Sequence, residues 1–576
     1  MIKKIFISQW VWLLFFLIAG GCASLFLRYE LLWDFANYHY YNPWAFLNNR
    51  WMYDIVPAGV NTFFNPVLDL PIYGLIKYFN DHPDFIIFVQ GLWSGAATFM
   101  IFLIAKVFFD ASTLKGKVQI FFAVAIAITS WPFFMQIGTT TNEMQISLMV
   151  LFAWWLLFKE VQKETSCKLW VFGSSGLVLG MAAGLKLTAG TYCVSTGIAI
   201  ILCYKLFKPF LKLMMMFILG GVIGFLITNG FWMWNLWQTF DNPVFPLLNN
   251  IFKSEWFDEL SYRDKLFLSK DALGYVFYPF YMFLGKLKTE GNSLIIDIRL
   301  ILLFFIFVGS GIYAIIKICK NRSQLLFSKS SLFLFVLCLV SYIVWLLAFS
   351  IQRYSIQFLV LGSILIVKVI TFLYPKEGNG RFILYSSFWV VVVYSLISTP
   401  WYSDKWGWWF DKTSHLVSFY TDVWPELKED LPYIEKYGKF TKFVDVEDVE
   451  LPDNTLLQIY DRPESAVIPV LAEKSNIRAI NMYVNSVSHE DNTYVFNEGK
   501  WLEWKKEVVS NHKGPKAILI SLHETVNVTN VFYQQAKKAG MECHLLINNI
   551  WNWLLCVPPE QVKEVFKWRY QEKIQK

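Results

Sequence analysis

The stretch QWVWLLFFLIAGGCASLFL, residues 9–27, decides the fold class of this chain because it contains no charged side chain. A helix of roughly 20 apolar residues is long enough to cross the hydrocarbon layer of a bilayer. The stretch follows the basic start Met1–Lys4 and lacks a clear small-residue cleavage site. We therefore expect a retained membrane anchor and not a signal peptide that is removed.

The composition of the whole chain agrees with a membrane protein. Of its 576 residues, 56% are hydrophobic and 16% are charged, and the mean hydropathy is +0.41. These values lie outside the usual range for soluble globular domains. Further apolar segments predict an α-helical polytopic protein with about eleven spans; they run at about 85–105, 118–137, 144–158, 169–185, 188–204, 213–232, 299–317, 330–350, 354–373 and 382–399.

The net charge of +7 is explained by topology and needs no nucleic-acid partner. Lys and Arg cluster in short connections, which the positive-inside rule places in the cytoplasm together with the N-terminus. These connections are residues 106–117, 159–168, 205–212, 317–329 and 376–381. An odd number of spans then leaves two loops outside, about 28–84 and about 233–298, followed by the polar tail. We expect residues 1–399 to form the membrane domain and 400–576 a soluble extracytoplasmic domain.

The sequence of the tail predicts an α/β domain. Short apolar runs alternate with helical stretches, and the expected strands are KFVDV (442–446), TLLQIY (455–460), KAILISL (516–522) and CHLLI (543–547). A turn near Asn549 would set Cys543 and Cys556 opposite each other on a hairpin, where a disulfide could join them. The other cysteines lie in or beside apolar segments without metal-ligand spacing. The sequence has no Walker A loop, dinucleotide fingerprint or zinc motif. The lack of a nucleotide-phosphate loop argues against an ATP-driven pump.

The first outside loop is the richest in chemistry, and its core is LLWDFANYHYYNPWAFLNNRWMYDIVPAGVNTFFNPVLDLP, residues 31–71. Asp34 follows the first span closely, in an aromatic setting that would raise its pKa by desolvation and suit a general base. The polar and aromatic side chains around it, typical of a sugar site, are Asn37, Tyr38, His39, Tyr41, Asn42, Asp54, Asn61, Asn65 and Asp69. The alternative is a loop folded on itself, with Asn and Asp as helix caps.

A second acid, Glu143, stands at the mouth of the fourth predicted span and faces the same side as Asp34. It could meet Asp34 in one site. Alternatively, residues 139–142 cap a helix and Glu143 complements its dipole.

Lys186 interrupts the apolar stretch GMAAGLKLTAG near the outer ends of the fifth and sixth spans. Charges at such positions are costly and usually functional, and this lysine is well placed to hold a lipid phosphate. Its small neighbours Gly184, Ala189 and Gly190 would leave room for a headgroup. Snorkelling of the ammonium group to the interface is the alternative.

Arg353 lies beside Tyr354 in a short outside connection, where arginine should be rare. Bidentate binding of an anionic phosphate would explain it, and pairing with Asp34 or Glu143 is the structural alternative. The second outside loop, with its NPVFP turn, Arg263-Asp264 and Asp297-x-Arg299, resembles a lid that contacts substrate or only supports the fold.

Together these features resemble the GT-C glycosyltransferases, the superfamily of protein O-mannosyltransferases and lipid A aminoarabinose transferases. The resemblance rests on Asp34 after the first span, Glu143 at a later helix mouth, Lys186 among small residues, the pair Arg353-Tyr354, and a soluble domain after the last span. It implies transfer of a sugar from a polyprenyl-phosphate donor to a glycan, lipid or protein acceptor, at the extracytoplasmic face of a bacterial inner membrane.

The resemblance also implies roles for single residues. Asp34 would be the general base of an inverting attack, with Glu143 as a second catalytic acid. The expected substrate contacts are Lys186, Arg353, Tyr354, His39, Tyr38, Asn42, Asp54 and Asn65. The first loop shows Trp-Asp-Phe instead of a paired-acid motif, so the use of a divalent cation stays open, as it varies among relatives.

A polytopic transporter or lipid flippase of the envelope-glycan pathway is the main rival. It would also have many spans with polar residues inside. Against it, the predicted spans show no duplicated halves, and charge within them is sparse apart from Lys186.

Overall fold

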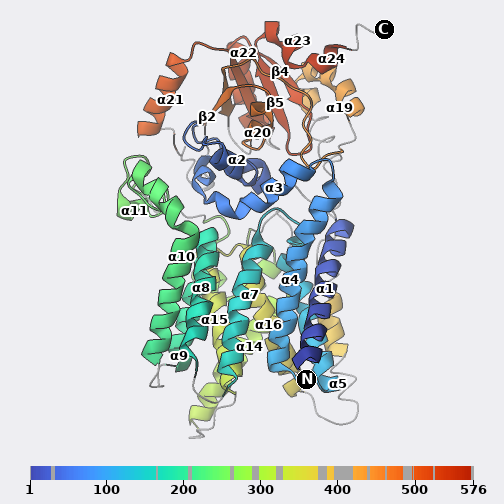
Figure 1. Ribbon diagram of the computed structural model, residues 1–576, viewed down its shortest axis with the longest axis vertical. Coiled ribbons are helices and arrows are strands. Elements are labelled where there is room, and N and C mark those ends of the chain that lie inside the picture. The colour runs from blue at the N-terminus through green and yellow to red at the C-terminus, as the bar shows by residue number, and fades with distance from the viewer. Residues whose placement is uncertain are drawn as a thin grey trace.

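A helical bundle carries a five-stranded α/β unit at one end, and the N-terminus lies near the opposite end (Figure 1). The structure is a computed structural model. It describes residues 2–27, 33–163, 167–204, 210–259, 265–288, 297–319, 328–373, 386–394, 420–437, 441–460, 464–483, 496, 499–522 and 526–571.

Eight helices within these ranges are long and apolar enough to cross a membrane. They are α1 (Ile2–Leu27), α4 (Pro83–Phe108), α7 (Glu143–Val161), α9 (Gly190–Tyr204) with the turn η4 (Leu187–Ala189), α10 (Phe210–Phe240), α14 (Ile298–Cys319), α15 (Lys329–Ala348), and α16 (Ile356–Leu373) with the turn η6 (Gln352–Ser355). The predicted class, a polytopic helical membrane protein, is confirmed.

Three predicted spans differ from these eight. The helix α8 (Leu169–Leu185) is apolar but has only 17 residues. The span expected at 118–137 is two helices, α5 (Leu114–Ile128) and α6 (Trp131–Met135). The break arises because the Ser130 hydroxyl accepts the Phe133 N–H at 3.4 Å and caps a new helix there. Of the last predicted span, 382–399, the structure describes residues 386–394, which are helical, so the count of eleven stays a prediction.

Glycines bring α8 and α10 into close contact. A Cβ added at Gly180 would lie 2.0 Å from the carbonyl oxygen of Gly221, and one at Gly224 would lie 2.0 Å from that of Leu177. Backbones can approach this closely only where side chains are absent. The same pairing places the end of α8, and hence Lys186, directly beside α10.

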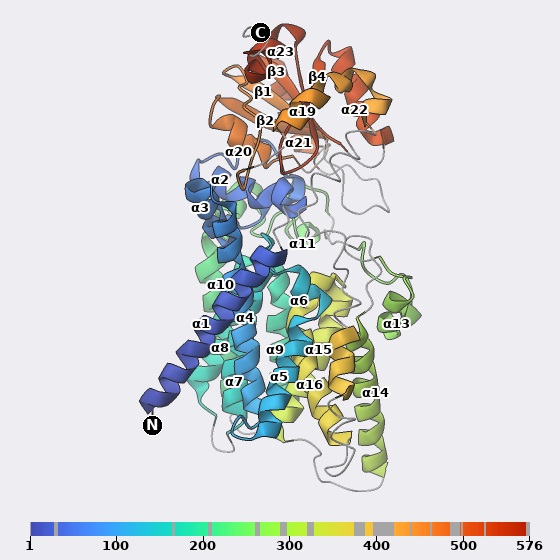
Figure 2. The ribbon, with the colours of Figure 1, turned by 90° about the vertical axis from the view of Figure 1, so that its right-hand side faces the viewer.

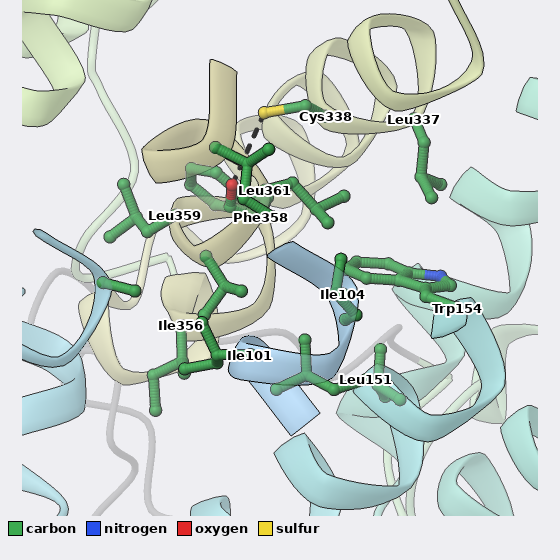
Figure 3. Close-up of a cluster of buried hydrophobic side chains, with 14 of the residues drawn as sticks. Ile101, Ile104, Leu151, Trp154, Leu337, Cys338, Ile356, Phe358, Leu359 and Leu361 are labelled. Atoms are coloured by element: carbon green, nitrogen blue, oxygen red, sulfur yellow. Dashed lines mark hydrogen bonds between the residues drawn. The ribbon is translucent and has the colours of Figure 1, made fainter. Parts of the chain in front are cut away.

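The core of the bundle is apolar and closely packed. Figure 3 shows side chains of α4, α7, α15 and α16 meeting there, among them Ile101, Leu151, Leu337 and Phe358. The buried Trp154 indole donates to the Thr196 hydroxyl at 2.9 Å, so its polar N–H is also satisfied. This packing fixes the ends of the helices that carry the site.

The α/β unit has strands β1 (Thr455–Tyr460), β2 (Ile477–Tyr483), β3 (Lys516–Ser521), β4 (Glu542–Leu546) and β5 (Trp553–Val557) in the order β2-β1-β3-β5-β4. Strand β1 is parallel to β2 and β3, whereas β5 is antiparallel to β3 and β4. The helices α20 (Val467–Ala472), α21 (Gly499–Asn511) and α22 (Val526–Lys538) accompany them. The predicted α/β fold of the tail is confirmed.

In the α/β unit, the strand predicted at KFVDV was wrong, and the disulfide between Cys543 and Cys556 is present. KFVDV forms only a single bridge, between Val446 and Asn548. Its Asp445 carboxylate accepts the N–H groups of Thr441 at 3.0 Å and Lys442 at 3.3 Å, which favours a turn over a ladder. Cys543 and Cys556 face each other across β4 and β5 and form the disulfide that the hairpin predicted.

The first loop lies between the bundle and the sheet, where both views place α2 (Tyr41–Leu47) and α3 (Leu70–Phe79) (Figure 2). It begins with a π-helical turn, η1 (Phe35–His39), and also contains the 3-10 turns η2 (Gly59–Phe63) and η3 (Pro66–Asp69). Its buried aromatic residues share one hydrophobic core with the α/β unit. The loop is thus held on both sides.

Candidate active site

Four of the predicted residues come together from four separate elements. Asp34 precedes η1, Glu143 begins α7, Lys186 follows α8, and Arg353 lies in η6 before α16. The helix α1 runs from the N-terminus toward the sheet (Figure 1), so Asp34, seven residues after its end, lies on the sheet side of the bundle, and the ion pairs place the other three beside it.

Two cations and two carboxylates make up the centre of the site. Arg353 Nη1 lies 3.2 Å from Asp34 Oδ2, and Arg353 Nε lies 3.8 Å from Glu143 Oε1. Lys186 Nζ pairs with Glu143 Oε1 and donates to the Thr141 carbonyl oxygen at 3.1 Å. The Glu143 side chain is 2% exposed and that of Arg353 is 23% exposed, so solvent reaches the arginine side of this centre.

These pairings bear on the alternatives that the sequence left open. Arg353 pairs with Asp34 and Glu143, as its structural alternative expected. Lys186 is held by a carboxylate, and its side chain is only 15% exposed, which differs from a lysine that snorkels freely to the interface. Arginine has five N–H groups in one plane, so a single guanidinium group can contact both carboxylates.

Tyr354 presents its ring to both cations. The centroid lies 5.5 Å from Lys186 Nζ and 5.3 Å from Arg353 Cζ, within the range of cation–π attraction. The Tyr192 hydroxyl donates to the Tyr354 carbonyl oxygen and holds this segment in place. The two cations are therefore oriented by an aromatic face as well as by carboxylates.

The electrostatics of Asp34 differ from the sequence-based expectation. Burial raises the pKa of this carboxyl, but the positive charges of Arg353, His39 and Lys186 outweigh burial, so its pKa lies below the ordinary aspartate value. The predicted raised pKa was wrong because the sequence could not show which cations surround the group. Asp34 is accordingly a carboxylate at neutral pH.

The π-helical turn brings His39 to the same side as Asp34, because residues five apart lie on one face of a π-helix. His39 Nδ1 lies 2.6 Å from Asp69 Oδ1, and the Asn142 amide also donates to that oxygen. The other ring nitrogen, Nε2, is buried and has no hydrogen-bond partner among the described residues. A carboxylate thus orients the imidazole and leaves Nε2 for another group.

Asp69 and Asn142 are the residues of this centre that sequence reasoning missed. Asp69 was only one of many polar loop residues, and Asn142 was expected to cap a helix. Instead, Asn142 has a φ of 64° and makes no side-chain cap, and Gln145 donates to its Oδ1 at 3.0 Å. Asparagine tolerates this left-handed conformation, but the sequence carries no signal for its contact with Asp69.

Tyr38 and Asn42 lie close to this centre along the first loop. The Tyr38 ring lies 4.2 Å from that of His39, and burial together with the charge of Asp34 raises the pKa of Tyr38. Its hydroxyl therefore stays protonated at neutral pH. The Asn42 amide donates to the Asn61 carbonyl oxygen at 2.8 Å, and its Oδ1 is buried without a hydrogen bond to any described residue.

Asp54 and Asn65 are tied to other parts of the fold. Asp54 accepts from Tyr41, from Arg50 and, at 2.8 Å, from the Ala479 N–H of β2. The Asn65 amide donates to the carbonyl oxygens of Gly184 at 3.1 Å and Thr228 at 2.9 Å. Both side chains brace the first loop against the elements around it.

The second outside loop is described only in part. Arg263 and Asp264 lie outside the described residues. Arg299 is buried, pairs with Asp297 at 2.7 Å and donates to the Ile126 carbonyl oxygen at 3.0 Å, which links α14 to the end of α5. Across the described ranges, no three acidic, histidine or cysteine side chains gather in a way that could hold a metal ion.

This architecture, with a helical bundle, a folded first loop and a terminal α/β unit, is the GT-C fold. Two solved structures share it over 96% of this chain and 98% of theirs: ArnT from Cupriavidus metallidurans bound to undecaprenyl phosphate, with a TM-score of 0.51 and 10% identity, and the same protein in the apo state, with a TM-score of 0.50 and 11% identity. No protein-family model matches the sequence, and no curated protein matches it.

Proposed function

We propose that this protein is a GT-C glycosyltransferase that moves a sugar from a polyprenyl-phosphate-linked donor to an acceptor at the extracytoplasmic face of the membrane. The observation that carries the proposal is the gathering of Lys186 and Arg353 beside the Asp34 carboxylate at one end of the bundle. Two oriented cations favour a phosphate, and a solved structure with this fold is bound to undecaprenyl phosphate.

In this proposal the two cations hold the phosphate of the lipid. As the acceptor oxygen or nitrogen attacks the anomeric carbon, the bond from that carbon to the phosphate oxygen breaks and its electron pair stays on the phosphate. Cations fixed at this oxygen stabilise the transition state more than the ground state. The acceptor proton passes to Asp34, and a single displacement of this kind inverts the anomeric configuration.

The remaining residues would orient these groups or contact the sugar. Glu143 fixes Lys186 and stands near Arg353, so it sets the positions of both cations. The imidazole Nε2 of His39 and the buried Oδ1 of Asn42 are proposed to meet sugar or acceptor hydroxyls. Tyr38 and Tyr354 would supply flat faces for the sugar and the cations. A divalent cation could assist, but no step depends on it.

The proposed location is the inner membrane of a bacterium, with the N-terminus in the cytoplasm. Three observations support this orientation. The Lys- and Arg-rich connections follow the positive-inside rule, and the site lies at the end of the bundle away from the N-terminus. The Cys543–Cys556 disulfide suits an oxidising compartment outside the cytoplasm.

The test is release of polyprenyl phosphate from a labelled lipid-linked sugar by purified protein. Asp34→Asn should lower turnover by roughly 100-fold or more, the range for loss of a general base, and Lys186→Ala should lower it comparably. Asp110→Asn and Lys115→Ala change exposed residues beside α5 and serve as matched controls. Unchanged turnover in both site variants contradicts the mechanism. Movement of the lipid across sealed vesicles without chemical change would instead favour the flippase.

A further inference from the structure

The α/β unit touches the turn that carries Asp34. The Ser465 hydroxyl donates to the carbonyl oxygen of Asn37, and the Ala466 N–H donates to that of Ala36 at 3.0 Å. Both acceptors belong to η1, and Ser465 and Ala466 lie just before α20. Two consecutive carbonyl groups of the π-helical turn are therefore bound by the α/β unit.

A second contact joins the middle of the first loop to the edge of the sheet. The Ile55 N–H donates to the Ala479 carbonyl oxygen at 2.9 Å, and the Asn481 N–H donates to the Ile55 carbonyl oxygen at 3.0 Å. Ile55 thereby forms a short parallel bridge with β2. The Asp54 carboxylate accepts the Ala479 N–H at 2.8 Å. Arg50 holds the same carboxylate and donates to the Ile477 carbonyl oxygen at 2.7 Å.

A third contact lies at the end of the loop. The Asn80 side chain accepts the Val444 N–H at 2.8 Å and donates to the Val444 carbonyl oxygen at 2.9 Å. The Phe443 N–H donates to the Asn80 carbonyl oxygen at 2.9 Å. The loop is thus bound near its beginning, its middle and its end by three different segments of the α/β unit.

Apolar packing joins the same two parts. Phe35 and Tyr41 of the loop are fully buried in one cluster with Val467 and Ile468 of α20. The burial of these side chains adds to the free energy that the hydrogen bonds contribute. The loop and the α/β unit therefore form one packed body, and the loop does not rest on the bundle alone.

This support matters because π-helical turns are rare and are frequently found at functional sites. A reacting group must be held to within roughly 0.5 Å of its productive position, which its own short turn cannot ensure. Asp34 stands at the start of η1, one turn from the carbonyl groups that Ser465 and Ala466 bind.

We propose that the α/β unit is a positioning element of the active site, in which Ser465 and the Ala466 N–H hold the η1 turn and thereby aim Asp34 and His39 at the acceptor. The inference rests on the proposed function, because that function supplies the reaction in which Asp34 acts. Ser465 is a positioning residue, since it acts through the backbone of the turn, and Asp54 has the same role at the middle contact.

Hydrogen–deuterium exchange of the full-length protein in nanodiscs tests the contact without any assumption about the reaction. Ser465→Ala removes the donor to Asn37, so peptides covering residues 35–42 should exchange roughly fivefold faster, the effect of one net hydrogen bond. The control is Ser475→Ala, which removes a buried hydroxyl that has no hydrogen bond to the described residues. Peptides of α7 should exchange as in the wild type in both variants.

The second readout separates positioning from substrate binding. With a labelled lipid-linked sugar, kcat of Ser465→Ala should fall roughly tenfold, while the Kd for undecaprenyl phosphate should stay unchanged because Lys186 and Arg353 are untouched. Asp54→Asn, which keeps the shape of the side chain, should also lower kcat and speed exchange in peptides covering residues 41–56.

The outcomes are distinguishable. Unchanged exchange of residues 35–42 in Ser465→Ala overturns the inference, and so does faster exchange with kcat equal to that of the wild type. If the wild-type protein transfers no sugar from any lipid donor, the proposed function fails. The exchange data then still decide whether the α/β unit holds the turn.

Discussion

Arg353 Nη1 lies 3.2 Å from Asp34 Oδ2, and this ion pair joins the first loop to the turn before α16. The same guanidinium group has its Nε 3.8 Å from Glu143. One arginine thus contacts the proposed base and the acid that holds Lys186. Its planar shape allows both contacts.

Arg353→Lys keeps the charge but loses the planar fork. We expect turnover to fall by roughly 10- to 100-fold, because a lysine cannot hold two acidic partners and a phosphate with fixed geometry. Release of labelled polyprenyl phosphate measures this effect. Thermal stability should change little, since lysine keeps the positive charge beside Asp34 and Glu143. Wild-type turnover in this variant would show that only the charge matters.

The pH dependence of the reaction should depend on Arg353. Although burial raises the pKa of Asp34, the surrounding cations, Arg353 first among them, bring it below its ordinary value. Because a general base works only when deprotonated, activity is lost as the pH falls through that pKa. Arg353→Gln removes a lowering charge, so the pKa rises and the acidic limb of log kcat/KM moves to higher pH. An acidic limb at the wild-type position would contradict this assignment.

The close contact of α8 with α10 predicts sensitivity to added side chains. Gly180→Val would push a side chain against the Gly221 carbonyl group, 2.0 Å from the position of its Cβ, and should cost roughly 1–3 kcal/mol or more. Gly309→Val in α14 is the matched control, because a Cβ there meets no described atom within 4 Å. Thermal unfolding in detergent should show a lower Tm for the first variant alone.

The disulfide should protect the β4–β5 hairpin. Cys543 and Cys556 are 13 residues apart, and closing a loop of this size stabilises a fold by roughly 3 kcal/mol. Replacing both by serine should speed proteolysis of the α/β unit, with the matched double change of the span residues Cys193 and Cys203 as the control. Mass spectrometry after alkylation should find the two thiols unreactive until a reductant is added. Full alkylation without reductant would disprove the bond.

Much of the fold was predictable because it depends on local patterns. Apolar length indicated the spans, and short apolar runs between helical stretches indicated β1, β3 and β4. The hairpin register followed from a short turn between Cys543 and Cys556. The break at Ser130 was missed because counting apolar residues does not show that a serine within the segment caps a new helix.

The site was predictable only in part. Asp34, Glu143, Lys186 and Arg353 each stood out as a charge in an unusual place, so composition and topology were enough to select them. Their mutual pairing, the lowered pKa of Asp34 and the contact of Asp69 with His39 depend on distances between remote segments. The same holds for Ser465, an ordinary serine in a polar tail.

The most direct measurement is a cryo-EM map of the protein in nanodiscs with undecaprenyl phosphate. The account predicts phosphate density within hydrogen-bond distance, about 2.7–3.2 Å, of Lys186 Nζ and of an Arg353 nitrogen, with the Asp34 carboxylate facing the same cavity. Phosphate density elsewhere, with both cations still paired only to Asp34 and Glu143, would contradict it.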